Sequence, residues 1–241
     1  MTKPLFRDDA YLTSTEATVV AINDRGGIVL DRSVFYPTGG GQPGDNGWLL
    51  GKDDSEISIV TAVKGDSPDE IVHVPAEGSV LPDVGSIVTA EIDWTTRHRY
   101  MRMHSCLHLL SAVLPYPVTG GQVSDGKGRL DFDIPEATLD KEEITKELNR
   151  LIMESHDVTS DWISDEELDA QPDLVKTMSV KPPRGSGQIR LIKVAGVDLQ
   201  PCGGTHVKNT SEIGDVQVRK IEKKGRQNRR VSLIFADEAN G

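Results

Sequence analysis

The stretch RHRYMRMHSCLHLLSAVL, from Arg97 to Leu114, decides the fold because it predicts a helix that carries a pair of histidines four residues apart. It contains no Gly or Pro and is followed by Pro115. Apolar residues recur at three- and four-residue intervals, as in an amphipathic helix, at Met103, Leu107, Leu110 and Leu114. His104 and His108 are four residues apart, so their Cβ atoms lie roughly 5–6 Å apart on one face. Both imidazoles can therefore bind one metal ion.

A second pair of metal-binding side chains follows about a hundred residues later. Cys202 and His206 occur in the segment CGGTH, directly after Pro201. The glycines and the proline predict a turn, so the backbone and not a helical phase must aim these two side chains. Three imidazoles and one thiolate are donors that suit zinc. We therefore predict one Zn²⁺ per chain, bound by a set of four ligands: His104, His108, Cys202 and His206.

Two residues between His104 and His108 limit which kinds of metal site the sequence can form. Ser105 stands where the Glu of a His-Glu-x-x-His metalloprotease would lie, which argues against that class. Cys106 lies two residues from each histidine and points elsewhere, so it is interpreted as a small buried apolar residue. Four protein donors can also close a tetrahedral zinc site, and a purely structural zinc stays open as an alternative.

Composition describes an ordinary soluble protein. Of 241 residues, 37% are hydrophobic and 27% are charged, with two cysteines, which excludes a disulfide framework. The N-terminus has no apolar signal region and the chain no run of 18 apolar residues, so we expect a cytoplasmic protein without a membrane segment. No obligate protein partner is evident.

The net charge of −11 is unevenly distributed. Between Lys208 and Arg230 eight basic residues accompany three acidic ones, so this segment is strongly positive. A basic patch on an acidic body can dock phosphates locally while the whole molecule avoids non-specific binding of nucleic acid. The alternative, a solvated hairpin that merely carries charge, stays open.

The pattern along the chain predicts an α+β protein, in which a small N-terminal β-barrel or sandwich precedes an antiparallel sheet with helices. Short strands are predicted before residue 93, at Ala17–Ile22, Gly27–Leu30, Glu56–Val63, Ile71–Val74 and Ser86–Ile92. Later strands are predicted at Gly128–Ile134, Ile189–Val194, Gly214–Glu222 and Arg229–Phe235. We expect domains at residues 1–92 and 93–241.

Two further helices are predicted in the second domain. The first covers Thr138–His156 with Thr138 as its N-cap and an apolar stripe of Ile144, Leu148, Leu151 and Ile152. The second is short, begins at a capping box from Ser164 to Glu167 and ends near Pro172.

A Gly-rich loop at residues 36–47 stands apart in the first domain. Gly39, Gly40 and Gly41 precede Gln42, and successive glycines allow a ligand or another backbone to approach closely. The loop matches neither a Walker A motif nor a dinucleotide-binding fingerprint. Both a tight loop and a binding site remain possible interpretations of it.

In this order, the Gly-rich loop, the paired histidines and the segment PCGGTHV resemble the AlaX family of free-standing alanyl-tRNA editing proteins, in their medium-length form, and the matching domain of alanyl-tRNA synthetases. The resemblance extends to the strand around Arg129–Phe132 and to Asn228–Arg230. It implies an ATP-independent zinc hydrolase, a barrel domain followed by an editing domain, and mischarged tRNA(Ala) as partner.

The family's activity is deacylation of tRNA(Ala) that carries serine or glycine, which protects translation fidelity. The resemblance implies that the four metal-binding residues form the zinc site and that Gln42 lines the catalytic pocket. It also implies substrate-binding roles for Gly39, Gly40, Gly41, Gln42, Arg229 and Arg230. Two alternatives stay open: a non-catalytic tRNA-binding module with a structural zinc, and a zinc-dependent esterase of small molecules.

Overall fold

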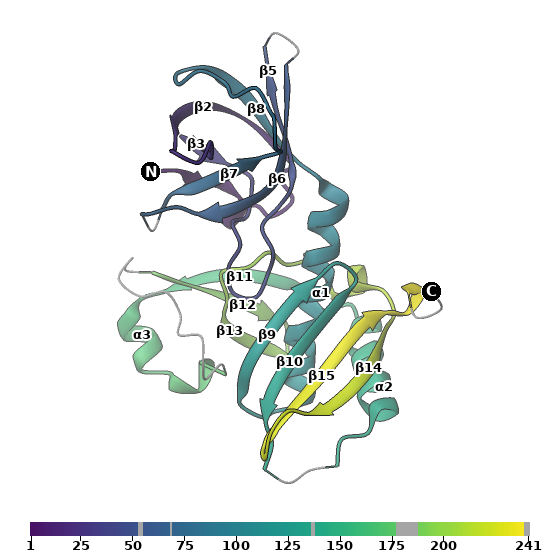
Figure 1. The fold of residues 1–241 in the computed structure, drawn as a ribbon. Helices are drawn as coiled ribbons and strands as arrows, with labels where there is room; N and C mark the ends of the chain where they lie inside the picture. The colour runs from purple at the N-terminus through teal and green to yellow at the C-terminus, as the bar shows by residue number, and fades with distance from the viewer. Residues whose placement is uncertain (53–54, 68, 136–137, 177–187, 239–241) are drawn as a thin grey trace. The chain divides into compact units, whose positions relative to one another are not determined.

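Alternating apolar and polar residues in the N-terminal part of the chain produce a closed barrel of six antiparallel strands (Figure 1). Around the barrel the neighbours are β2 (Ser14–Ile22), β3 (Ile28–Leu30), β7 (Ile71–Pro75), β6 (Glu56–Lys64), β5 (Gly47–Gly51) and β8 (Ile87–Ile92). Along β6, the buried Ile57 and Ile59 alternate with exposed residues, as the pleat of a strand requires. Two short strands, β1 (Lys3–Pro4) and β4 (Arg32–Ser33), form a separate parallel pair.

The structure, a computed structural model, describes residues 1–52, 55–67, 69–135, 138–176 and 188–238. The chain separates into two compact units, Met1–Arg99 and Tyr100–Gly241. The predicted α+β class, with an N-terminal barrel followed by helices and antiparallel sheets, is confirmed. The assignment of separate roles to residues 1–92 and 93–241 stays a prediction.

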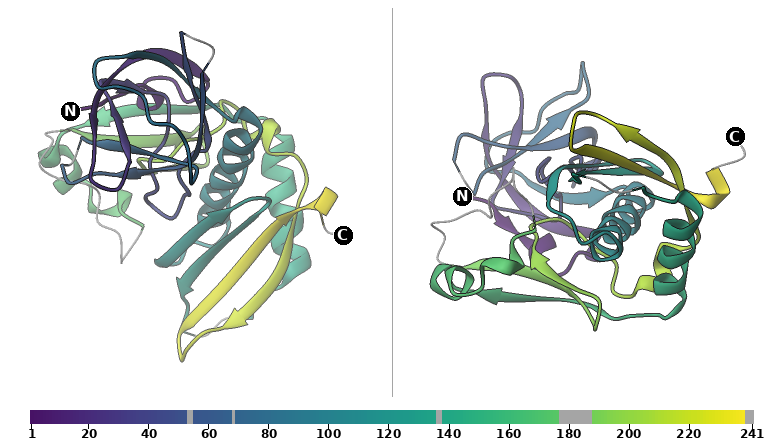
Figure 2. Two further views of the ribbon diagram at one scale, coloured as in Figure 1. Left: turned by 45° about the horizontal axis from the view of Figure 1, so that its top comes forward. Right: turned by 90° about the horizontal axis from the view of Figure 1, so that it is seen from below.

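The second unit is built around the part of helix α1 (Trp94–Val113) that follows Arg99, and this part lies between two antiparallel sheets (Figures 1 and 2). The larger sheet has the strand order β14 (Val216–Lys223), β15 (Asn228–Phe235), β10 (Lys127–Asp133) and β9 (Val118–Ser124). The smaller sheet has the order β11 (Val158–Ile163), β12 (Ile189–Val194) and β13 (Asp198–Pro201). The remaining described helices are α2 (Lys141–Met153), α3 (Asp165–Asp169) and the short 3-10 helices η1 (Leu5–Arg7), η2 (Pro172–Leu174), η3 (Thr210–Ile213) and η4 (Ala236–Glu238).

The larger sheet packs closely on α1 because Gly128 has no side chain. A Cβ atom at Gly128 would lie 2.6 Å from the sulfur of Met103 and 3.2 Å from Leu107. The predicted apolar stripe of α1 is therefore confirmed, and Met103, Leu107 and Leu110 are all buried. His104 and His108 each follow a residue of that stripe by one position, about 100° around the helix, and His108 faces Asp198 of the smaller sheet.

The predicted beginning of α2 is wrong by a few residues. Its N-cap is Asp140, whose carboxylate accepts hydrogen bonds from the backbone N–H groups of Glu142 and Glu143 at 2.8 and 3.0 Å. A carboxylate at the N-terminus of a helix also interacts favourably with the positive end of the helix dipole. Asp140 therefore caps this helix better than Thr138 does. The apolar stripe of α2 is buried as predicted. The capping box from Ser164 to Glu167 is confirmed at the start of α3.

A buried ion pair anchors the Gly-rich loop inside the first unit. The guanidinium of Arg97 donates to the carboxylate of Asp45 and to the carbonyl oxygens of Val34 and Ala10. Asp45 in turn accepts a hydrogen bond from the backbone N–H of Tyr36 at 2.5 Å. Removing one partner of such a pair leaves an uncompensated charge, which typically costs about 3–5 kcal/mol. The pair therefore fixes both ends of the loop.

No helix among the described residues is long and apolar enough to cross a membrane.

His73 on β7 is buried inside the barrel and is held by two hydrogen bonds. Its Nδ1 lies 2.9 Å from the carbonyl oxygen of Ile28, and its Nε2 lies 2.7 Å from the hydroxyl of Ser33. The carbonyl can only accept, so Nδ1 carries the proton and Nε2 accepts from Ser33. Burial disfavours the charged form and lowers the pKa of His73 from 6.5 to about 4, although the bond to Ile28 opposes that shift.

We predict that His73 makes the barrel less stable in acid. Between pH 6.5 and about 4 the unfolded chain binds a proton at His73 and the folded chain does not. The free energy of unfolding therefore has its full value above pH 6.5, as far as His73 is concerned. It falls by about 3 kcal/mol as the pH approaches 4. Urea unfolding of the wild type and of His73→Gln at several pH values measures this, because the variant lacks that part of the pH dependence. Equal slopes for the two proteins would contradict the prediction.

Candidate metal centre

Four side chains from two distant parts of the chain converge beside α1. His104 and His108 come from α1, and Cys202 and His206 follow β13. One ligand atom from each residue can be chosen so that all four lie within 4.8 Å of one another. The sulfur of Cys202 lies 3.5 Å from Nε2 of His104 and 3.3 Å from Nε2 of His206. The three histidines are buried and Cys202 is partly exposed, so the group could hold a metal ion.

The electrostatics of the cluster favour a thiolate at Cys202. Burial raises the pKa of this thiol, but the charges of His104 and His206 outweigh burial and hold the pKa well below its ordinary value. Burial and the neighbouring charge of His104 both lower the pKa of His206. A thiolate and neutral imidazoles are the forms in which these side chains bind metals. Cys106 differs, because burial raises the pKa of its thiol to about 12.

A carboxylate behind the cluster orients His108. Nδ1 of His108 lies 3.1 Å from Oδ2 of Asp198, so the ring donates there and turns Nε2 toward the cluster. Burial lowers the pKa of His108, but the Asp198 carboxylate and Cys202 outweigh it and raise the pKa to about 9. Asp198 also accepts from the ammonium of Lys176 and, at 2.7 Å, from the amide of Gln200. Its own pKa is lowered to about 2 because those bonds outweigh burial.

Ser105 orients His206 in the same manner. The hydroxyl oxygen of Ser105 lies 3.1 Å from Nδ1 of His206 and accepts from the backbone N–H of Val207 at 3.2 Å. A hydroxyl has two acceptor sites, so it can accept from both groups. In the tautomer that leaves Nε2 free to bind a metal, Nδ1 of His206 carries the proton and donates it to this hydroxyl. The residue where a metalloprotease has its general base therefore holds a ligand in place here.

The turn that carries Cys202 is fixed by its own hydrogen bonds. The guanidinium of Arg190 donates to the carbonyl oxygen of Gly204 at 2.8 Å, and the carbonyl of Arg190 accepts from the backbone N–H of Cys202 at 3.0 Å. The backbone N–H of Gly204 donates to the Cys202 sulfur at 3.4 Å, a contact that stabilises a thiolate. These contacts fix the segment after β13, which bends at Gly204.

The glycines of the Gly-rich loop form a tight turn in the first unit. The backbones of Gly39 and Gln42 exchange hydrogen bonds of 3.1 and 2.9 Å, and Gly40 and Gly41 between them have positive φ angles of 56° and 80°. Two successive positive φ values favour glycine and are typical of a type I′ turn. The hydroxyl of Tyr36 donates to the carbonyl of Gly39 at 2.7 Å. The backbone of Gln42 is therefore fixed, and its role in a pocket stays a prediction.

The two arginines predicted to bind substrate lie on β15 of the larger sheet. Arg230 donates to the carboxylate of Asp131 at 2.7 and 2.8 Å. Arg229 lies at the end of the β14–β15 hairpin and donates to the carbonyl oxygens of that turn. The structure does not bring either residue into the metal cluster. Their role in binding substrate stays a prediction.

Sequence reasoning missed the residues that support the ligands. Asp198, Gln200 and Lys176 have no spacing that links them to His108, since 68 or more positions separate them along the chain. Asp198 and Gln200 do share one signal, because they alternate on β13 in a segment that the pattern did not identify as a strand. Buried polar residues at alternate positions of a short strand are unusual, and here they face the histidine.

Known proteins are similar in sequence to this chain over nearly its whole length. The family model "Threonyl and Alanyl tRNA synthetase second additional domain" matches residues 189–232, and the model "tRNA synthetases class II (A)" matches residues 10–96. The chain is 34% identical to "Alanyl-tRNA editing protein AlaX-M" of Methanosarcina acetivorans, over 98% of this chain and all of that protein. It is 33% identical to the AlaX-M protein of Pyrococcus horikoshii, over 97% of each. It is also 33% identical to "Alanine--tRNA ligase" of Saccharolobus islandicus, over 92% of this chain and 25% of the ligase.

We predict that the carboxylate of Asp198 is required for tight metal binding. Asp198→Asn keeps the size of the side chain but removes its charge, so Nδ1 of His108 loses its strong acceptor. Removing such a partner typically weakens metal binding about 10- to 100-fold. Competition with a chromophoric chelator measures the affinity. Asp161→Asn, on the exposed face of β11, is the matched control and should bind metal like the wild type. Equal affinities for both variants would show that Asp198 does not orient His108.

Proposed function

The chain belongs to the AlaX family of alanyl-tRNA editing proteins, and we propose that it is a zinc-dependent hydrolase that deacylates mischarged tRNA(Ala). The amino acid removed is chiefly serine and also glycine. One observation carries this proposal: three buried imidazoles and one partly exposed thiol lie together in a chain that is similar to these editing proteins over 98% of its length. Ester hydrolysis needs no ATP, and the proposal places the protein in the cytoplasm, where tRNA is charged.

The geometry of the donor set supports zinc as the metal. Zn–N and Zn–S bonds are about 2.0–2.1 and 2.3 Å long, so a tetrahedral zinc separates sulfur from nitrogen by about 3.6 Å. The corresponding distances from the Cys202 sulfur are 3.5 Å to His104 and 3.3 Å to His206. Mixed thiolate and imidazole donors also favour zinc over hard cations such as Mg²⁺. We propose that one zinc ion binds His104, His108, Cys202 and His206.

The bound metal would supply a Lewis acid beside the ester. The ester bond of aminoacyl-tRNA is already activated, so holding it against a positioned water is a sufficient task for the protein. Cys202 is the partly exposed ligand, which makes its side of the cluster the approach for the aminoacyl end. Asp198 and Ser105 keep two of the imidazoles in their metal-binding tautomer throughout, and neither residue needs to move a proton.

Selection of serine over alanine follows from buried polar groups. A synthetase pocket for alanine cannot strongly reject a ligand that adds one hydroxyl, so a second site is needed. A site built to hydrogen-bond that hydroxyl leaves its own polar groups unpaired when alanine enters, which can discriminate by about 10⁴ in favourable cases. We propose that Gln42, on a backbone fixed by its glycine turn, lines this pocket together with Gly39, Gly40 and Gly41.

A non-catalytic tRNA-binding module with a structural zinc is the second candidate function. The observation that favours it is the number of donors, because four protein ligands can complete the tetrahedron without substrate. It predicts tRNA binding without turnover. An esterase of small molecules would hydrolyse simple seryl esters without tRNA, and the basic residues near the β14–β15 turn argue against that candidate.

We predict rapid loss of serine, but not of alanine, from charged tRNA(Ala) when the purified protein is added. A zinc chelator should abolish the reaction, and added zinc should restore it. Cys202→Ala should lose both zinc and deacylation, because the thiolate is a ligand. The loss of acid-precipitable, labelled serine from the tRNA measures the deacylation rate. Metal analysis measures the zinc content. A folded, zinc-loaded protein that removes neither amino acid would favour the binding module.

We predict that Gln42→Ala slows deacylation of seryl-tRNA(Ala) about 10- to 100-fold while zinc stays bound. The reason is the loss of a hydrogen bond in the pocket, which is worth about 1–3 kcal/mol when its partner stays buried. Gln171→Ala, an exposed glutamine after α3, is the matched control. Wild-type rates in both variants would show that Gln42 does not line the pocket. That result would not contradict the proposed zinc site.

A further inference from the structure

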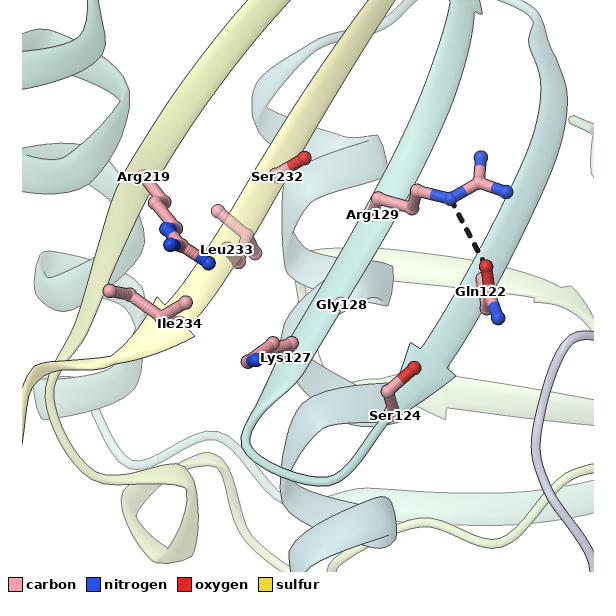
Figure 3. A pocket seen from close by; sticks show the side chains of 9 residues that line it. All are labelled: Gln122, Ser124, Lys127, Gly128, Arg129, Arg219, Ser232, Leu233 and Ile234. Atoms are coloured by element: carbon pink, nitrogen blue, oxygen red, sulfur yellow. Dashed lines mark hydrogen bonds between the residues drawn. The ribbon is translucent and has the colours of Figure 1, made fainter. Parts of the chain in front are cut away.

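The outer face of the larger sheet carries a shallow hollow lined by cations (Figure 3). Its volume is about 180 Å³, below the range of about 300–1,000 Å³ typical of small-molecule pockets. The residues around it include Lys127, Arg129 and Arg219 and no carboxylate. Gln122, Ser124 and Ser232 supply neutral polar groups between these cations. The hollow is thus too small for a drug-sized ligand, but it suits part of an extended anion.

Strand register places these groups on one face. Arg129 pairs with Gln122 on β9 and with Ser232 on β15, so the three side chains form one row across the sheet. Lys127, two residues before Arg129 on β10, forms the next row with Ser124 and Ile234. Gly128 lies between them and faces α1, because side chains alternate along a strand. The cations therefore point away from α1, toward solvent.

A bulge in β14 adds a further cation to this face. The register between β14 and β15 shifts between Val218 and Lys220, so Arg219 is the extra residue. Val218 is buried, whereas Arg219 and Lys220 are both exposed. In a regular strand these two neighbours would point to opposite faces, and a bulge re-aims one of them. The irregularity thus places two successive basic residues on the exposed side.

The cations of the hollow are incompletely neutralised by the protein. Arg129 donates to the carboxylate of Asp131 at 2.9 Å, and Arg230 shares that same carboxylate. Within the described ranges of the chain, neither Lys127 nor Arg219 forms an ion pair. Like charges gathered on one face repel each other, and an anion placed among them relieves that repulsion. Glu222 pairs with Lys220 at 3.0 Å and Asp131 with Arg230 at 2.7 Å, so the excess positive charge is confined to the hollow itself, where a polyanion would dock on a molecule of net charge −11.

We propose that this face docks the phosphate backbone of the tRNA substrate. The identity of the polyanion rests on the proposed function. Phosphates are contacted in proteins by Arg, Lys, Ser and Gln side chains, which are the residue types around the hollow. The metal cluster lies on a neighbouring face of α1, because His104 follows Met103 by one residue, about 100° around a helix that is about 10–12 Å across. The surface holds the duplex part of the tRNA, while its single-stranded 3′ end continues past the edge of the sheet toward the metal.

The test measures binding of uncharged tRNA(Ala), by fluorescence anisotropy, to the zinc-loaded full chain over a range of salt concentrations. The variant Lys127→Gln/Arg219→Gln should bind about tenfold or more weakly at low salt. The slope of log affinity against log salt should become shallower by about 2, near one for each lost phosphate contact. The charge-keeping variant Lys127→Arg/Arg219→Lys should retain most of the affinity.

The matched control is Lys141→Gln/Lys146→Gln, which removes the same charge from the exposed side of α2. Unchanged binding in the sheet variant, or an equal loss in the α2 control, would overturn the proposed docking face. Zinc content at the wild-type level shows that each variant is folded. Binding does not depend on turnover, so a wild type that binds tRNA at this face but removes no serine would sustain the docking surface and refute the proposed function.

Discussion

Three imidazoles and one thiolate meet beside α1, and much of the second unit keeps them there. Bringing four such donors together in a largely buried place costs free energy unless a positive ion or a proton compensates the thiolate. The structure reduces this cost before any ligand arrives. A carboxylate faces His108, a hydroxyl faces His206, and a backbone N–H faces the sulfur of Cys202. Each contact fixes an orientation that metal binding would otherwise have to impose, so the site is preorganised.

The position of α1 follows from this constraint. A helix that supplies ligands on one side must be held firmly on its other side, and Gly128 allows β10 to approach Met103 and Leu107 closely. Arg102 adds a lateral contact, because it donates to the carbonyl of Ile213 and stacks on the ring of Phe235. These contacts lock the helix in rotation as well as in translation. A rotation of even one residue, about 100°, would point both histidines away from β13.

The elements that sequence reasoning predicted are those with a clear apolar period. β12 was predicted with its observed bounds, and the stripes of α1 and α2 are buried as expected. It missed β1, β4, β5, β9, β11 and β13, and the three of these in the second unit break the alternation for identifiable reasons. β11 is polar and exposed along most of its length, β9 contains two glycines, and β13 turns Asp198 and Gln200 inward. In β13 the pattern is inverted because those polar side chains serve His108, so the rule fails at the site itself. The four ligands could be predicted from their chemistry, whereas their supporting contacts exist only in three dimensions.

The charge distribution separates two tasks that a tRNA-binding protein has to reconcile. A uniformly basic surface would gain affinity for every nucleic acid, since counterion release does not depend on sequence. An overall charge of −11 opposes that capture, so a phosphate backbone gains from contact only over a small area. The bulge at Arg219 adds a cation in that area, and β14 stays paired with β15 on both sides of it with a register shifted by one residue. The affinity for tRNA then depends on binding of the duplex at one place on the sheet. The same contacts would also set the distance from the duplex to the metal site. A few cations on a rigid sheet give a lower total affinity for nucleic acid than a uniformly basic surface would. They also hold the bound tRNA in one position, and hydrolysis of a single ester bond requires such positioning.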